Sequence, residues 1–341
     1  MPNIQDVAKH AKVSVMTVSR VLNHSPLVKE STRQHVLQAM RDLNYVPNQL
    51  TNALYRGESR TLAVIVPDIR NPFFTAVVRG AEDAANERGY RIILCNTDEN
   101  PEKEYDYIEM SYSIRVEGIA IMASGDESLS NLHKLQSFGI PFVLIDRPVY
   151  GIEADIVKGM HEEGAAQLVK YLLEMGHKRI AFMVGKYSIS PWRELLTGYQ
   201  KAFKEAGLNP SEGDVFHFPS FPHEGALQQV LDSILQCNPR PTAIIAGSQF
   251  EASQVLQILL RKNISVPHDL SVACFGDSNP YPSMDKFLTS AELPVRQFGT
   301  KAIEVLLNRI NGNLIQAPFK LALPYSLALR QSVLLRQPNE N

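Results

Sequence analysis

A short stretch near the N-terminus combines an arginine with small polar side chains at helical spacing. Arg20 can fork onto the O6 and N7 atoms of guanine, whereas Val15 and Met16 can only contact thymine methyl groups or exclude water. These three residues predict a base-reading helix face in the major groove of DNA. Small polar groups around them predict contacts to phosphate, although Thr17 and Ser19 could equally be ordinary helix surface. The predicted phosphate contacts are Ser14, Thr17, Ser19, Asn23, Tyr45 and Asn48.

Three short helices would position these groups. The first runs from Ile4 to Ala11, where apolar residues recur at i, i+3, i+4 and i+7. Lys12-Val13 form the turn, and Ser14 is expected to cap the second helix. A third helix is expected over 30–43. The corner between the first two helices has the layout of a helix-turn-helix.

The charge of the chain is unevenly distributed. Residues 1–60 contain eight Lys or Arg and four Asp or Glu, which gives +4, while the whole chain carries −2. The remainder must therefore carry −6. A three-helix module with no nucleic-acid role is the plain alternative, but a basic segment on an acidic body favours a polyanionic partner.

The same stretch resembles the DNA-binding domain of the lactose-repressor/galactose-repressor (LacI/GalR) family. Residues 6–23 read D-V-A-x-x-A-x-V-S-x-x-T-V-S-R-V-L-N, a pattern of eighteen positions, and residues 43–48 read L-N-Y-V-P-N. This is far more specific than a generic helix-turn-helix. The resemblance implies that Val15 and Met16 occupy positions that vary with the operator sequence, so base reading should depend on Arg20 and on DNA shape.

A hinge is expected after this head. The resemblance implies that residues 48–54 fold on operator DNA, with Thr51 and Leu54 at the minor groove and Leu54 wedged between base pairs from each subunit of a dimer. The alternative is that Leu54 packs on the body of the protein. The predicted boundaries are a helix-turn-helix domain over 1–47 and a hinge helix and linker over 48–60.

The rest of the chain alternates strand-length apolar runs with helical segments. Strands are expected at 62–67, 91–96, 118–122 and 141–145, and again at 179–183, 214–218, 242–246 and 270–274. Continuous apolar strands of this kind belong to parallel sheets covered on both faces. No apolar run is long enough to span a membrane, and the three cysteines are expected to be reduced core residues in a cytoplasmic protein.

The predicted fold is therefore an all-α helix-turn-helix head on an α/β core of two Rossmann-like lobes. The resemblance, carried by Pro67-Asp68 with Asn71-Pro72-Phe73-Phe74 and by Ile145-Asp146-Arg147, implies the fold of periplasmic sugar-binding proteins, with three crossings between lobes. The core should cover 61–341. Its first lobe is expected over about 61–158 and 292–324, and its second over about 162–290 and 325–341.

The cleft between the lobes is the expected effector site. The resemblance places aromatic rings and polar groups there, and Arg147 either faces the cleft or pairs near Asp146. Compared with the family, two acids are replaced and Lys158 is added. The expected cleft residues are Phe73, Phe74, Arg147, Lys158, Arg193, Phe221, Gln249 and Asp277.

The charge change suggests an effector that is anionic or phosphorylated rather than a neutral sugar. An equally open alternative is that the effector site has decayed and that a protein corepressor controls the chain. Neither G-x-G-x-x-G nor G-x-x-x-x-G-K-[ST] occurs, and no hydrolase or metal-ligand spacing is present, so we expect neither an enzyme nor a cofactor or metal.

Together these features predict a cytoplasmic bacterial transcription repressor that binds a palindromic double-stranded DNA operator as a homodimer and associates with the nucleoid when bound. Two linked heads would gain effective concentration over one. The alternative is a ligand-binding module of the periplasmic sugar-binding type without a DNA function.

Overall fold

The computed structural model describes residues 2–22, 25–46, 58–209, 214–219, 224–276, 287–313 and 318–336. The chain divides into two compact units, a head over Met1–Ser59 and a core over Arg60–Asn341. The predicted site residues Asn23, Asn48, Thr51, Leu54, Phe221 and Asp277 lie outside the described residues.

The head closes a small core with three helices: α1 (Ile4–His10), α2 (Val15–Leu22) and α3 (Glu30–Asp42). Asn3 begins α1 with a capping box, because its side chain accepts from the Gln5 and Asp6 amides while Asp6 accepts from the Asn3 amide. The turn between α1 and α2 contains Lys12 in the left-handed region, with φ of 51°. The buried core of the head consists of Val7, Ala8, Ala11, Val18, Val21, Val36 and Ala39.

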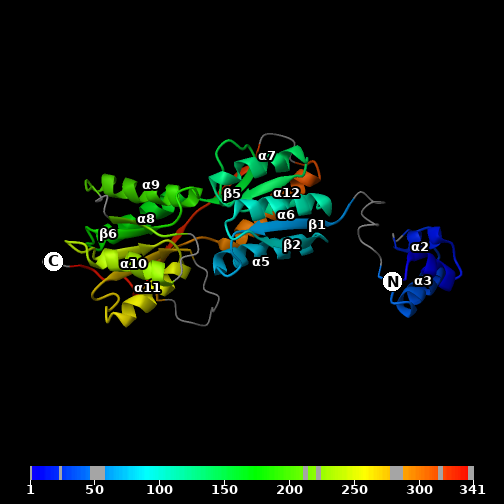
Figure 1. Cartoon of the computed structure of the whole chain (residues 1–341), viewed down its shortest axis with the longest axis horizontal. Coiled ribbons are helices and arrows are strands. Elements are labelled where there is room, and N and C mark those ends of the chain that lie inside the picture. The colour runs from blue at the N-terminus through cyan, green and yellow to red at the C-terminus, as the bar shows by residue number, and fades with distance from the viewer. Residues whose placement is uncertain are drawn as a thin grey trace. The chain divides into compact units, whose positions relative to one another are not determined.

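The first lobe is built on a parallel sheet of order β11-β5-β4-β3-β1-β2. Its strands are β1 (Thr61–Val66), β2 (Arg91–Asn96), β3 (Gly118–Ile121), β4 (Phe142–Ile145), β5 (Asp155–Gly159) and β11 (Lys320–Leu323). The helices that cover it are α5 (Pro72–Asn86), α6 (Pro101–Ser113), α7 (Leu129–Ser137) and α12 (Val295–Ile310), with a 3-10 turn η1 (Asp126–Ser128) before α7. Figure 1 shows α12 among these helices although it follows the second lobe in the chain.

Two glycines allow α5 and α12 to cross at close range. A Cβ atom added to Gly80 would lie 2.0 Å from the Arg296 carbonyl oxygen, and one added to Gly299 would lie 1.9 Å from the Val77 carbonyl oxygen. Because both obstacles are backbone atoms, only glycine fits at either position. The crossing fixes α5, whose first turn carries Phe73 and Phe74.

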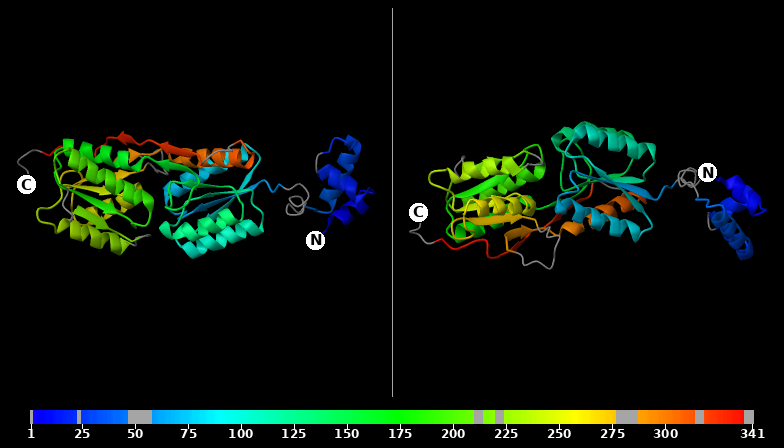
Figure 2. Two further views of the ribbon diagram at one scale, coloured as in Figure 1. Left: turned by 90° about the horizontal axis from the view of Figure 1, so that it is seen from above. Right: turned by 60° about the horizontal axis from the view of Figure 1, so that its bottom comes forward.

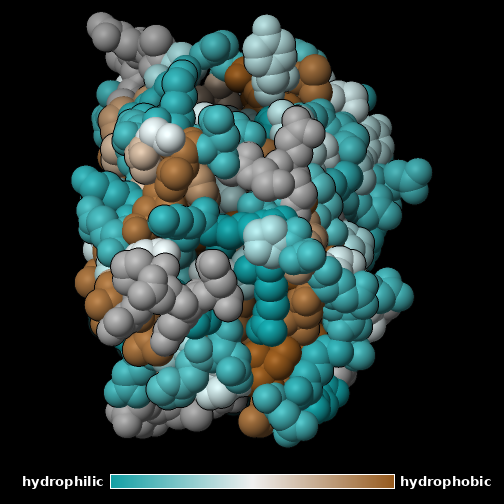
Figure 3. Space-filling view, turned by 90° about the vertical axis from the view of Figure 1, so that its left-hand side faces the viewer, coloured by the Kyte–Doolittle hydropathy of each residue, from teal (hydrophilic) through white to brown (hydrophobic). Residues whose placement is uncertain are grey.

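The second lobe repeats the plan with a sheet of order β12-β10-β9-β8-β6-β7, parallel except for the antiparallel pair β10–β12. Its strands are β6 (Ile180–Val184), β7 (Val215–His217), β8 (Ala243–Ala246), β9 (Ser271–Phe275), β10 (Thr289–Glu292) and β12 (Ser326–Ala328). Its helices are α8 (His161–Glu174), α9 (Ser190–Glu205), α10 (Glu224–Leu235) and α11 (Gln249–Arg261). Figure 3 shows that hydrophilic residues predominate at one end of this lobe, with small hydrophobic patches between them.

The chain passes between the lobes three times. It crosses from β5 to α8 at Met160, returns from β10 to α12 at Leu293 and Pro294, and crosses again from β11 to β12 at Pro324 and Tyr325. Figure 2 shows the late segments, in orange and red, running along one edge of both lobes. The three connections lie at the boundary between the two sheets, so they form the hinge of the core.

Of the cysteines, Cys95 and Cys274 are buried as expected, but Cys237 is only partly buried because it follows the end of α10. In the described ranges, no helix is both long and apolar enough to cross a membrane. In those same ranges, no group of three or more His, Cys, Asp or Glu side chains is arranged to hold a metal ion.

His177 connects the stability of the second lobe to pH. Its side chain is fully buried after α8, with Nδ1 2.9 Å from the Thr242 hydroxyl and Nε2 without a hydrogen-bond partner among the described residues. Burial, helped by the charge of Arg336, lowers the pKa of His177 to about 4. The unfolded chain, with an ordinary pKa near 6.5, binds a proton here at higher pH than the folded protein. Folding stability is therefore lost as the pH falls from about 6.5 to about 4.

We expect His177 to account for about 3 kcal/mol of that loss. In urea unfolding at a series of pH values, His177→Gln should flatten the dependence of stability on pH between about 6.5 and 4. His217→Gln, which removes an exposed histidine, serves as the control. An unchanged slope in the His177 variant would show that another group titrates.

Candidate functional site

Helix α2 begins at a side-chain cap. The Thr17 amide donates to Ser14 Oγ at 3.1 Å, and the hydroxyl groups of Ser14 and Thr17 lie 2.9 Å apart in a hydrogen bond. Thr17 and Ser19 are half-buried, and Tyr45 packs partly against the core of the head. The hydroxyl groups of Ser14 and Thr17 thus have a structural task in fixing the start of the helix.

The outer face of α2 carries the three residues that the sequence predicts to face DNA bases. Val15 is 42% exposed and Met16 is 64% exposed, although apolar side chains of this size are usually covered. Arg20 is exposed in the last turn of α2, and its guanidinium has no ion-pair or hydrogen-bond partner among the described residues. This face offers one unpaired cation beside two apolar side chains.

Arg33 stabilises the end of α2 from the neighbouring helix. Its guanidinium donates to the Val21 carbonyl oxygen in the last turn of α2 at 3.5 Å and to the Ser25 carbonyl oxygen at 2.9 Å. It also lies 3.3 Å from Glu30 Oε2. Arg33 is not among the predicted site residues, because one arginine on the inner side of α3 has no distinctive sequence signal. Arg33 therefore organises the head rather than offering a free charge to DNA.

A cavity of about 370 Å³ lies between the two lobes of the core. It is located at the carboxyl ends of the strands of both sheets, where parallel α/β sheets usually bind ligands. Of the residues predicted for the cleft, Phe73, Phe74 and Arg147 line it. The other described side chains that face it include Asp68, Arg70, Glu99, Asp146, His161, Lys186, Trp192, Phe218, Ser248, Phe250, Glu251 and Tyr325.

Each lobe contributes an edge-to-face aromatic pair to this cavity. In the first lobe the rings of Phe73 and Phe74 have centroids 5.3 Å apart, and in the second lobe those of Trp192 and Phe218 are 5.6 Å apart. The indole of Trp192 lies against two glycines that follow strands. A Cβ atom on Gly185 would lie 2.5 Å from it and one on Gly247 only 2.1 Å, so glycine at both positions makes room for the ring.

The cavity's arginines are held by carboxylates of the first lobe. Arg147 donates to Glu99 Oε1 at 2.8 Å and to the Ala123 carbonyl at 3.1 Å, and its guanidinium stacks over Phe74. Arg70 donates to Asp68 at 2.9 Å. The sequence predicted that Arg147 either faces the cleft or pairs near Asp146. In the structure Arg147 lines the cavity and pairs with Glu99.

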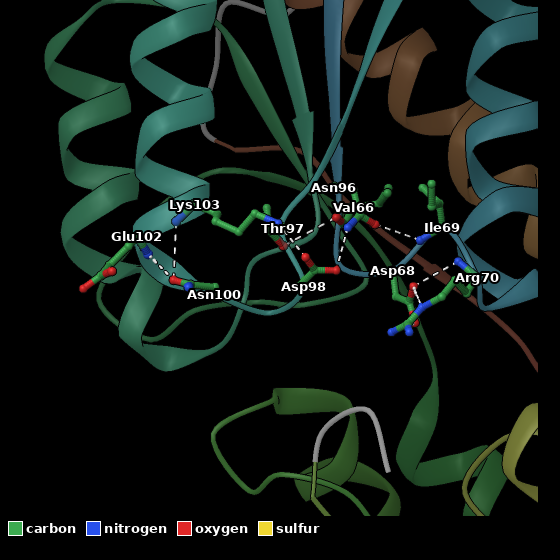
Figure 4. Close-up of polar contacts among 10 residues, drawn as sticks. All are labelled: Val66, Asp68, Ile69, Arg70, Asn96, Thr97, Asp98, Asn100, Glu102 and Lys103. Atoms are coloured by element: carbon green, nitrogen blue, oxygen red, sulfur yellow. Dashed lines mark hydrogen bonds and ion pairs between the residues drawn. The ribbon is translucent and has the colours of Figure 1, made fainter. Parts of the chain in front are cut away.

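A strained loop after β2 presents Glu99. Asp98 and Glu99 have φ of 54° and 52°, a left-handed conformation that costs energy for residues other than glycine. Figure 4 shows the contacts that hold this loop: Asn96 Nδ2 donates to Asp98 Oδ1 at 2.7 Å and Lys103 Nζ donates to Asp98 Oδ2 at 2.5 Å. The hydrogen bond from Lys103, followed by that from Asn96, lowers the pKa of Asp98, which stays charged.

Glu251 occupies the facing wall. It is 7% exposed in the first turn of α11, and the Ser248 hydroxyl donates to its Oε2 atom. Burial raises the pKa of Glu251, and the charge of Glu99 adds to that effect, while the Ser248 hydrogen bond opposes it. The sequence contained a pattern that could have identified Glu251. Ser248-x-x-Glu251 is a helix-capping pattern, and it follows an expected strand, where a helix begins at the cleft.

A buried triad joins the crossings to the cavity wall. His161 Nε2 lies 2.8 Å from Asp146 Oδ1, and His161 Nδ1 lies 2.8 Å from the Tyr325 hydroxyl. His161 follows the first crossing and Tyr325 lies in the third. Burial alone would raise the pKa of Asp146, but His161, the Gly159 amide and Arg147 hold it below its usual value.

The other described residues predicted for the cleft are not among those that line the cavity. Lys158 Nζ instead lies 2.5 Å from Glu194 Oε1, and Arg193 lies 2.7 Å from Asp126 Oδ2. Both pairs join the lobes, because Glu194 and Arg193 are on α9 while Lys158 and Asp126 belong to the first lobe. Gln249, at the start of α11, is flanked by the lining residues Ser248 and Phe250.

The expectation of an anionic effector depended on two replaced acids and on the added Lys158. The second of these grounds does not hold, because Lys158 is neutralised by Glu194 and does not line the cavity. A third pair, Lys186 with Glu127 at 3.0 Å, also joins the lobes beside the cavity. The sequence could not show these pairs because each joins segments that are distant in the chain.

Comparisons with known proteins agree with this two-part architecture. Residues 3–48 match the model of bacterial regulatory proteins of the lacI family, and residues 169–333 match a periplasmic binding protein-like domain. The chain is 32% identical over 311 residues to the HTH-type transcriptional repressor PurR of Photobacterium profundum, covering 91% of this chain and 92% of that relative. The chain belongs to the lacI family of bacterial regulatory proteins. As a lacI-family protein it is a DNA-binding transcriptional regulator.

Solved structures share the lacI-family fold over nearly the whole chain. The transcriptional regulator CelR in complex with cellobiose superposes with a TM-score of 0.72 at 27% identity, covering 97% of this chain and all of that one. The lac repressor dimer bound to operator and the anti-inducer ONPF superposes with a TM-score of 0.83 at 23% identity, covering 98% and 99%. The predicted fold, a helix-turn-helix head with a two-lobe periplasmic-binding-protein-like core, is thus confirmed.

Proposed function

We propose that this protein represses transcription by binding a palindromic operator as a homodimer, and that the cavity between its lobes binds a small-molecule effector. The exposed face of α2 carries the first part of the proposal. Val15, Met16 and Arg20 project from a helix whose start is fixed by Ser14 and whose end is fixed by Arg33. A rigid helix with an unpaired arginine on its outer face is suited to read base edges.

Dimerisation follows from the size of the head. One three-helix unit with few phosphate contacts binds DNA weakly, whereas two linked heads on an inverted repeat gain effective concentration. Such a regulator would act on the chromosome in the cytoplasm, by binding rather than by catalysis. The chain is similar to PurR, which is a transcriptional repressor.

Selection of bound sequences from a random DNA library tests the proposal. The full chain should enrich an inverted repeat, and a fragment that begins at Arg60, where the core unit starts, should enrich nothing. The binding constant of the enriched site should fall steeply with salt, since basic residues of the head displace counterions from phosphates. Enrichment of a single half-site, or of no inverted repeat, by the full chain would contradict the proposed palindromic operator and dimeric binding.

Leu54, predicted as the wedge of the hinge, gives a second test. Replacing Leu54 with alanine should weaken binding to the selected operator and reduce the DNA bend, because an apolar wedge opens a base step at a cost of a few kcal/mol that wider contacts offset. Electrophoretic mobility of circularly permuted operator fragments measures the bend, and fluorescence anisotropy measures the affinity. If bend and affinity both persist, Leu54 packs elsewhere.

The cavity supports the sensor part of the proposal. It has the volume of a small-molecule site, two aromatic walls and a few fixed polar groups, and the three crossings border it. The CelR structure to which the chain is similar is a complex with cellobiose. A ligand that contacts both lobes would change the angle between them and so affect the predicted hinge helix and linker over 48–60. The coupling free energy between ligand binding and DNA binding is typically about 1–3 kcal/mol.

A further inference from the structure

Every described Arg or Lys side chain that lines the cavity has a carboxylate partner, but not every carboxyl group there has a cationic partner. Among the described lining residues the cations are Arg70, Arg147 and Lys186, and each is paired with a carboxylate, namely Asp68, Glu99 and Glu127. No described cation in the cavity is therefore left for an anionic ligand. An anion would have to break one of these pairs before it could form its own.

Glu251 is the carboxyl group without a cationic partner. The Ser248 hydroxyl is the only side-chain group within hydrogen-bond distance of it among the described residues, and it contacts Oε2. The carboxyl group's other donors are the backbone amides of Ser248 and Glu251, and the residue is more than nine-tenths buried in the cavity wall. A buried carboxyl group that has hydrogen bonds but no cationic partner is costly to ionise, so a cation placed beside it would stabilise its charged form.

Glu99 faces Glu251 from the opposite lobe. Glu99 is mostly buried, and both carboxyl groups line the same cavity, one from each lobe. The charge of Glu99 also contributes, after burial, to the raised pKa of Glu251. Arg147 neutralises only Glu99. The positive end of α11, which would otherwise attract an anion, already has Glu251 in its first turn.

We propose that the cavity selects a small molecule with a protonated amine, which lies between the Glu99 and Glu251 carboxyl groups while its apolar body lies between the two aromatic pairs. This inference rests on the proposed role of the cavity as the effector site. An ammonium group at this position donates to the Glu251 carboxyl group, offsets the charge of both carboxylates and lies near aromatic faces that attract cations. Closing the lobes on such a ligand brings the two carboxyl groups together without repulsion.

Three probes with the same indole ring test the sign of this selectivity: indole-3-ethylamine, indole-3-ethanol and indole-3-acetate. Calorimetric titration into the full-length protein should give at least about tenfold tighter binding of the amine than of the acetate, with the alcohol between them. The shared ring keeps the apolar contribution constant, so the order reports the charge preference.

Two substitutions locate the effect. Glu251→Gln should bring the amine and acetate affinities to within about threefold of each other, because the unpaired charge is gone. Glu99→Gln should increase acetate binding, because it frees Arg147. Glu174→Gln, which removes an exposed carboxylate at the end of α8, should leave the order unchanged and serves as the control.

The proposal is overturned if the acetate binds as tightly as the amine, if Glu251→Gln leaves the order intact, or if none of the three probes binds at concentrations up to about 1 mM. Binding of the enriched operator by the same preparation, measured without any probe, reports separately on the DNA-binding function. A protein that binds operator but shows the wrong probe order has a DNA-binding head and a cavity of different selectivity.

Discussion

Replacing Arg20 with alanine is expected to weaken binding to the operator by about 1–3 kcal/mol, or about ten- to a hundredfold in affinity. The guanidinium is exposed on α2 and has no partner among the described residues, so its donors are available to a guanine edge. Its neighbours Val15 and Met16 have no hydrogen-bonding groups and cannot replace it. Specificity should also relax at the base pair that Arg20 contacts.

Fluorescence anisotropy with the enriched operator and with single-base variants measures this effect. Arg20→Lys separates base reading from phosphate attraction, because lysine keeps the charge but loses the planar fork. Arg41→Ala removes an exposed arginine of α3 that already binds Gln38, and it should change the affinity little beyond a smaller salt dependence. Full recovery of affinity and specificity by lysine would make Arg20 a phosphate contact.

Replacing Asp146 with alanine is expected to cost about 3–5 kcal/mol of folding stability. The substitution leaves His161 and the Gly159 amide without their buried acceptor, and it places alanine at φ of 62°. Asp146→Asn should cost less, because asparagine tolerates this backbone region and keeps an acceptor. Comparing the two variants separates loss of the charge from loss of the hydrogen bonds.

Urea unfolding measures the loss of folding free energy, and amide hydrogen exchange shows which segments of the protein become less stable. Exchange should accelerate at the three crossings in the Asp146 variants, because the triad connects the first and third crossings beside the second. Asp214→Ala, which breaks the buried pair with Arg179 in the second lobe, should destabilise the protein without that pattern. A cost below about 1 kcal/mol for Asp146→Ala would mean that the triad contributes no more than an exposed ion pair.

Much of the architecture could be predicted because apolar periodicity is a local property. The expected strand at 91–96 coincides with β2, and the expected third helix ends one residue beyond α3. The short strands β10 and β12 were not predicted, because three or four residues at the edge of a sheet carry little pattern. The strand β5 was not predicted, because Lys158 and Gly159 interrupt the apolar run after Ile156 and Val157.

A residue of the candidate site could be predicted only where its position depends on one segment of the chain. Phe73 and Phe74 line the cavity because they begin a helix directly after a buried strand. Lys158 and Arg193 do not line it, because each is neutralised by a partner from the other lobe. Glu99 depends on a left-handed loop after β2, and neither backbone conformation nor ion pairing over long distances is visible in the sequence.

The edge strand β11 has a consequence for synthesis of the protein. It completes the first sheet beside β5, yet roughly 160 residues of chain separate the two strands, and α12 also follows the second lobe. At about 5–20 residues per second, a ribosome needs about 10–30 s to translate that interval. During this time the nascent first lobe exposes one edge of its sheet and the face that α12 will cover, so it is open to chaperones until the last tenth of the chain has emerged.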